Sequence, residues 1–108
     1  MEGLELTAFQ IISSVGTARS CYIEAIQVAK KGDYEESEKL IKEGDEAFIE
    51  GHDAHAGLLQ KEASGEGNTV NLLILHAEDQ LMSAEAFKTI ALEFIDAYKR
   101  IEALEKKA

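Results

Sequence analysis

The residues of this chain that could do chemistry are three histidines and one unusually placed aspartate. His52 and His55 lie three residues apart in one predicted helix, and His76 lies near the start of another. A histidine on an apolar helix face is usually a core residue whose ring is hydrogen-bonded. His76 differs because it directly follows the apolar tetrad 72–75, and because Asp79 lies only about 60° around the helix from it. His76 is therefore the candidate for imidazole chemistry.

Asp79 is the anomaly of this segment, because it stands in line with the apolar residues of one helical stripe. An unpaired ionised carboxylate there is too costly to keep, so Asp79 needs a cation, a hydrogen-bond donor or a proton as its partner. In a symmetric trimer three copies of Asp79 would meet on the axis, where a bridging divalent ion would remove their repulsion. Oxygen ligands favour magnesium or calcium over zinc. The alternative is a buried carboxylate bonded to a side chain such as His76.

Other possible sites are weaker. His52 and His55, together with His76 or Asp79, have a spacing compatible with a zinc or iron site, but a His-x-x-His pair arises readily by chance. A side-chain hydrogen bond is the alternative for His52. Cys21 is the single cysteine, which excludes an internal disulfide, and it is expected to be a small buried apolar residue. The chain has no glycine-rich phosphate loop and no basic aromatic surface, so most enzyme classes have no support.

The composition excludes further classes of function. The net charge is −10 in 108 residues, which repels phosphate backbones and argues against nucleic-acid binding. The longest apolar run is the tetrad 72–75, far short of the roughly 20 residues that cross a bilayer, and the amino terminus lacks the pattern of a signal peptide. We therefore expect a cytoplasmic protein that does not span a membrane, with residues 1–108 forming a single domain.

The absence of proline and the abundance of Ala, Leu, Glu and Lys predict an all-α fold. At the first break Gly32 can end a helix and Asp33 can cap the next, with Glu36 completing a capping box. At the second break, a turn-rich stretch, Asn68 or Thr69 can cap a third helix. The predicted helices cover residues 6–30, 34–63 and 70–106.

Short connections between long helices predict an antiparallel three-helix bundle. The second helix carries a seam with heptad spacing, in which Gly44 and Gly51 would permit close backbone approach; tolerated glycines are the alternative. The seam consists of Tyr34, Ser37, Ile41, Gly44, Phe48, Gly51, His55 and Leu58.

The third helix carries two apolar stripes, although one bundle needs only one. The first stripe is Phe87, Ile90, Phe94, Ala97 and Ile101, and the second is Leu72, Leu75, Met82 and Ala86. Leu73, Ile74 and Leu81 add apolar character on the remaining sides. The pattern predicts self-association, with the front half of this helix at a subunit interface; a partly exposed apolar face is the alternative.

Two runs carry a family resemblance, namely EGHDAHAGLLQKEASGE at 50–66 and LHAEDQLM at 75–82. Together with Gly-Asp-Tyr at 32–34 and Tyr-Lys-Arg at 98–100, they resemble the lactose/cellobiose-type IIA component of the phosphoenolpyruvate-dependent sugar phosphotransferase system (PTS). The likeness covers nearly the whole chain. The family commonly has glutamine where this chain has His55 and Glu78, and a second histidine where it has Gln80.

The resemblance implies a cytoplasmic homotrimer of three-helix subunits, nine helices in all. It implies a phosphoryl group carried on His76 between the histidine carrier HPr and a IIB cysteine, for uptake of a β-linked disaccharide such as cellobiose or lactose. It also implies that Asp79 binds a metal, one Mg²⁺ per trimer on the three-fold axis. An acidic Glu78 near the phosphoryl group is expected to disfavour the dianion somewhat. The alternative function is a trimeric helical adaptor in which His76 is only structural.

Overall fold

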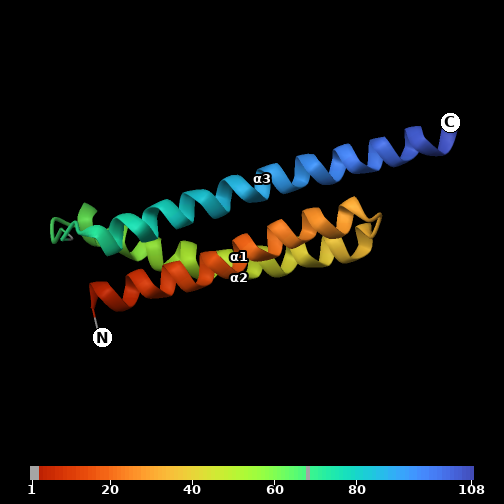
Figure 1. Ribbon diagram of the computed structural model, residues 1–108. Helices are drawn as coiled ribbons and strands as arrows, with labels where there is room; N and C mark the ends of the chain where they lie inside the picture. Colours follow the sequence, from red (N-terminus) through yellow and green to blue (C-terminus); the bar gives the residue numbers. More distant parts are fainter. Residues whose placement is uncertain (1–2, 68) are drawn as a thin grey trace.

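The computed structural model describes residues 3–67 and 69–108, which form three long helices (Figure 1). These are α1 (Leu4–Lys30), α2 (Tyr34–Ala63) and α3 (Leu72–Lys107). The described residues contain no strand, so the all-α prediction is confirmed. None of the described helices combines the length and apolarity that a bilayer crossing requires.

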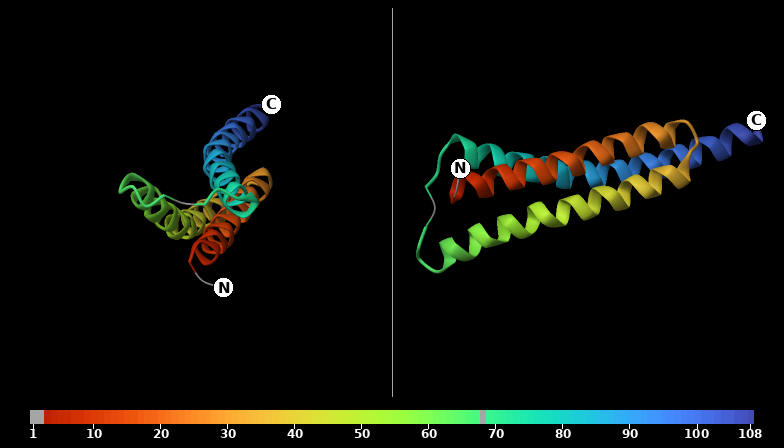
Figure 2. Two further views of the ribbon diagram at one scale, coloured as in Figure 1. Left: turned by 90° about the vertical axis from the view of Figure 1, so that its left-hand side faces the viewer. Right: turned by 90° about the horizontal axis from the view of Figure 1, so that it is seen from below.

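The helices run up, down and up in an elongated bundle of 62 × 21 × 20 Å. Figure 2 shows α1 and α2 lying side by side over most of their length, with the end of α3 extending beyond the α1–α2 turn. α3 packs chiefly against α1 and touches α2 much less. The predicted antiparallel three-helix bundle is therefore confirmed. The interface between α2 and α3, called the open seam below, is less closely packed than the α1–α2 and α1–α3 interfaces.

The turn between α1 and α2 follows from Gly32 and Asp33. Gly32 adopts φ +88°, and its N–H donates to Ala29 O (2.9 Å) while that of Asp33 donates to Val28 O (2.9 Å). This is a Schellman ending, which needs a glycine in the left-handed region. The Asp33 carboxylate accepts from Glu36 N–H (3.1 Å), as predicted. The reciprocal half of the predicted capping box does not form, because the Asp33 N–H is already bonded to α1.

The start of α3 differs from the prediction. Asn71 is the N-cap, and its side-chain oxygen accepts from Ile74 N–H at 2.9 Å. The helix therefore begins at Leu72, and Thr69 is not its cap. The other predicted cap, Asn68, lies outside the described residues. The helix therefore starts slightly later than the predicted residue 70, because it is Asn71 rather than Thr69 that satisfies the orphan N–H groups of the first turn.

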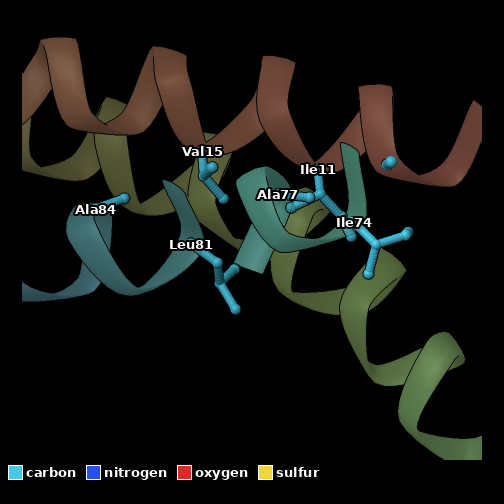
Figure 3. Packing of buried hydrophobic residues seen from close by; sticks show 7 residues of the cluster. Ile11, Val15, Ile74, Ala77, Leu81 and Ala84 are labelled. Atoms are coloured by element: carbon cyan, nitrogen blue, oxygen red, sulfur yellow. The ribbon is translucent and has the colours of Figure 1, made fainter. Parts of the chain in front are cut away.

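The core is built on one face of α1. Its buried residues recur at helical spacing, and most are small: Ala8, Ile11, Val15, Ala18, Tyr22, Ala25 and Ala29. Figure 3 shows Ile11 and Val15 beside the turns of α3 that carry Ile74, Ala77 and Leu81. Small side chains let the helix axes approach closely, so burial here comes from backbone proximity as much as from large side chains.

α3 buries neither of the two stripes that its sequence suggested. Its buried residues are Ile74, Ala77, Leu81, Ala84, Ala91 and Ile95. Both predicted stripes are largely exposed instead, with Met82 at 68%, Leu72 at 82% and Phe94 at 47%. The expectation that one of these stripes is buried in the core was wrong. α1 packs instead against the strip of α3 that contains alanines, where the two helices can approach most closely. The outer face of α3 is thus apolar along most of the helix.

The predicted seam of α2 is confirmed, with Ser37, Gly44 and Gly51 buried along it. A Cβ at Gly44 would lie 2.6 Å from Tyr22 Cε1, and a Cβ at Gly51 would lie 2.6 Å from Val15 Cγ1. Real Cβ contacts are not that short, so both glycines are required by the close packing of α1 on α2 rather than merely tolerated. Ser37 donates its hydroxyl to Ala25 O (2.9 Å), which satisfies it inside the core.

These glycines yield a stability prediction. Replacing Gly51 by alanine should lower the free energy of unfolding by about 1–3 kcal/mol, because the new methyl group overpacks against Val15. The matched control is Gly57→Ala in the same helix, where an added Cβ meets nothing within 4 Å. That variant should gain roughly 0.5–1 kcal/mol from helix propensity. Urea denaturation at equal protein concentration compares them, and equal stabilities of the two variants would contradict the packing argument.

Candidate functional site

The outer face of α3 brings the two candidate residues together. His76 and Asp79 lie one helical turn apart, and both are exposed. Exposed apolar side chains lie above and below them on the same face: Leu72, Leu75, Met82 and Ala86. Ionisable groups surrounded by apolar side chains on an open helix face are typical of a surface that another chain covers.

Asp79 makes no hydrogen bond or ion pair within the described parts of the chain. The sequence-based alternative, a buried carboxylate bonded to His76, is therefore not what the structure contains. Solvent satisfies the carboxylate in one isolated subunit, but covering this face with apolar surface would remove that solvent. The carboxylate would then need a cation from outside its own chain. Among the described residues no three His, Cys, Asp or Glu side chains of one subunit gather as a metal site.

His76 lies in the second turn of α3, anchored by the cap at Asn71 and by buried neighbours on the opposite side. Ile74 and Ala77 flank it in sequence and pack against α1, so the backbone that carries His76 is fixed. The imidazole itself is exposed and bonded to no other described side chain. The side chain is therefore accessible from outside the subunit, and an imidazole in its neutral form has a nitrogen lone pair for nucleophilic attack.

The histidines of α2 do not join His76. His55 Nε2 lies 2.5 Å from Glu78 Oε1 of α3, and the His55 side chain is 14% exposed. His52 is exposed and stacks loosely on Phe48, with ring centroids 6.0 Å apart. A site combining these two with His76 or Asp79 is not formed, nor is the hydrogen bond predicted for His52 among the described residues.

The contact between His55 and Glu78 was missed by the sequence analysis. Both residues depart from the resembled family, which has glutamine at each position, but nothing in their spacing shows that they face each other across two helices. The one feature of the sequence that could have indicated the contact is that both positions depart from the family's glutamine. The contact also changes the expectation for Glu78, because its carboxylate is engaged with α2 on the side of α3 away from His76.

Cys21 takes no part in this surface. It is a free thiol on α1, and it is half-buried rather than buried as the sequence predicted. Burial raises the pKa of its thiol, and the negative charges of Glu43 and Glu24 raise it further. A raised pKa keeps the thiol protonated, which makes it a poor nucleophile.

The chain is similar in sequence to a known protein family and to several of its characterised members. The family model described as "PTS system, Lactose/Cellobiose specific IIA subunit" matches residues 6–99. The chain is 41% identical over 100 residues to the lichenan-specific phosphotransferase enzyme IIA component of Bacillus subtilis (strain 168), covering 93% of this chain and 91% of the relative. It is 41% identical over 97 residues to the PTS cellobiose-specific EIIA component of Lactococcus lactis subsp. lactis (strain IL1403), covering 90% and 84%.

A solved structure is also similar. The crystal structure of the PTS cellobiose-specific enzyme IIA from Bacillus anthracis superimposes with a TM-score of 0.91 at 40% identity, covering 95% of each chain. At this identity the likeness extends beyond the arrangement of helices to the sequence that builds them.

Proposed function

The chain belongs to the lactose/cellobiose-specific IIA family of the sugar phosphotransferase system, and from that premise we propose that it is a phosphocarrier of the cytoplasm. His76 accepts a phosphoryl group from phospho-HPr and passes it to the cysteine of a IIB component. The relay serves uptake of a β-linked disaccharide such as cellobiose or lactose. Membership of a phosphotransferase system supports a phosphotransfer role in general, whereas the residue and the partners are part of this proposal.

The observation that carries the proposal is the state of His76. Its imidazole is exposed, bonded to no other described side chain, and mounted on a backbone fixed by Ile74 and Ala77. Phosphoryl transfer asks mainly for a free nucleophile in line with the donor, with little further covalent chemistry. His55 is engaged with Glu78 and is therefore less suited to the task.

The two transfers balance as simple displacements. In the first, the lone pair of a neutral His76 nitrogen forms a bond to phosphorus, and the phosphorus–nitrogen bond to the donor histidine of HPr breaks, its electron pair returning to that ring. In the second, the thiolate of the IIB cysteine attacks phosphorus, and the bond to His76 breaks with its electron pair returning to the imidazole. One proton moves with each transfer: His76 gives up the proton on its other ring nitrogen as it gains the phosphoryl group while the departing ring of HPr takes one up, and His76 takes up a proton again when the cysteine removes the group.

The outer face of α3 supports assembly as a homotrimer in which three copies of this face meet. Three Asp79 carboxylates would then lie near the axis without protein donors of their own chains. Carboxylate oxygens are ligands that Mg²⁺ accepts, and the unpartnered state of Asp79 fits that role. One Mg²⁺ on the axis would supply the positive charge that offsets the three carboxylates. A neighbouring subunit over Leu72 and Leu75 would exclude water from a phosphorylated His76.

The net charge and the relatives bear on the partners and the sugar. A charge of −10 steers basic partners to the surface and repels acidic ones. Similar proteins carry names that specify lichenan, cellobiose, galactose or lactose at comparable identity. We therefore place the choice among these sugars outside this chain, in the membrane component of the system.

The proposal predicts an acid-labile adduct on one residue. After incubation with phosphoenolpyruvate, enzyme I and HPr, the wild-type mass should rise by about 80 Da, one phosphoryl group. The substitution His76→Gln should abolish the adduct without unfolding the protein, because the replaced side chain is exposed. Intact-protein mass spectrometry before and after an acid wash measures this.

The matched control for this experiment is His52→Gln, which removes another exposed histidine and should leave the adduct in place. An adduct that survives in His76→Gln would move the site to His52 or His55. The absence of any adduct in wild type, with the carriers shown to be active, would favour the trimeric adaptor.

A second prediction concerns Asp79. Replacing Asp79 by leucine should remove the bound metal and leave the trimer intact or tighter, since replacing buried charges by apolar groups is often neutral or stabilising. Metal content by mass spectrometry and mass by sedimentation check both parts. Asp53→Leu, which removes an exposed carboxylate of α2, should keep the metal. Dissociation of Asp79→Leu to monomers at micromolar concentration would contradict the assignment.

A further inference from the structure

Among the described residues, the open seam between α2 and α3 is bridged by three side-chain hydrogen bonds or ion pairs. One lies near the α1–α2 turn, one near the middle of the bundle, and one at the end where α3 carries His76. They are Tyr34 Oη to Glu102 Oε2 (2.8 Å), Lys88 Nζ to Asp45 Oδ1 (3.1 Å), and His55 Nε2 to Glu78 Oε1 (2.5 Å). The third contact is the polar link that ties the His76-bearing turns of α3 to α2.

The direction of this link follows from helix geometry. Glu78 comes two residues after His76, about 200° around the helix, so the two side chains leave α3 on nearly opposite sides. His55 reaches Glu78 from α2, on the side away from His76. An ionised carboxylate only accepts hydrogen bonds, so this contact requires the His55 ring to carry a proton on Nε2 when Glu78 is ionised. With 40% of its side chain exposed, Glu78 would otherwise be free to choose its rotamer.

Building on the proposed function, we infer that His55 is a positioning residue for phosphoryl transfer at His76. It holds the Glu78 carboxylate against α2 and so away from the phosphoryl group. Glu78 lies within one helical turn of His76, so a carboxylate released from α2 is within a Debye length of a phosphoryl dianion. Like charges at that distance disfavour the phosphorylated state. Glu78 is thus tolerated within one helical turn of the acceptor because His55 keeps its carboxylate on the opposite side of α3.

The test measures the phosphoryl-transfer equilibrium rather than the presence of an adduct. His55→Leu removes the donor and keeps an apolar side chain in a largely buried position. Wild type and variant are equilibrated with a known ratio of phospho-HPr to HPr, and the phosphorylated fraction is read by intact mass. The ratio of phosphorylated to free protein should fall by about two- to fivefold. His55→Gln, whose amide N–H still donates, should restore most of it.

Two controls separate restraint of Glu78 from general loosening of the seam. In His55→Leu/Glu78→Gln no carboxylate needs restraint, so the ratio should return to the wild-type value or exceed it, which makes the two substitutions strongly non-additive. Lys88→Gln weakens a different α2–α3 contact, while Asp45 keeps its bond from Tyr22 Oη (2.7 Å). That variant should lower thermal stability and leave the phosphorylation ratio unchanged.

The possible outcomes distinguish the positioning role of His55 from the proposed phosphocarrier function. A His55→Leu ratio equal to wild type, or a double variant as low as His55→Leu, would overturn the positioning role while leaving the phosphocarrier intact. A fall in Lys88→Gln as large as that in His55→Leu would also overturn it, because loosening alone would then suffice. Wild type that takes up no phosphoryl group would instead refute the proposed function itself.

Discussion

The outer face of α3 is the constraint on which the rest of this structure depends. α1 occupies only the narrow strip of α3 that contains Ala77, Ala84 and Ala91, which leaves large apolar side chains pointing outward. A carboxylate, Asp79, stands among them. The described residues include no further element that covers that face, which supports the proposed assembly with other copies of the chain. The proposed trimer and metal both follow from that need.

The same constraint explains where chemistry can occur. Residues that pack against α1 fix the backbone of α3, while residues on the opposite side remain available to a partner. His76 combines both conditions, since Ile74 and Ala77 anchor its turn and its own ring is exposed. His55 and Glu78 belong to the open seam between α2 and α3, where the sparse packing gives single polar contacts more influence. One side of α3 thus packs against α1 and fixes the backbone, while the opposite side carries the candidate site.

Much of this could be predicted from the sequence because its signals are local. Gly32 and Asp33 mark a turn by backbone chemistry, and Gly44 and Gly51 mark close packing by the side chains they lack. Asp79 was identified by its place on an apolar stripe, and His76 by following the apolar tetrad 72–75 with Asp79 close to it on the helix. The core face of α3 could not be predicted, because that choice depends on the shape of α1 rather than on hydrophobicity. The spacing along the chain did not predict the His55–Glu78 contact for a similar reason, since it joins residues from two helices.

The proposed trimer is tested most directly by the mass of the native protein in solution. Sedimentation equilibrium at micromolar concentration should give about 35 kDa, three times the 11.8 kDa of one chain, because the outer face of α3 is then covered by two further copies. A single species at the monomer mass would contradict the account: the apolar face would stand open, and the three copies of Asp79 would have no common axis on which to share a cation.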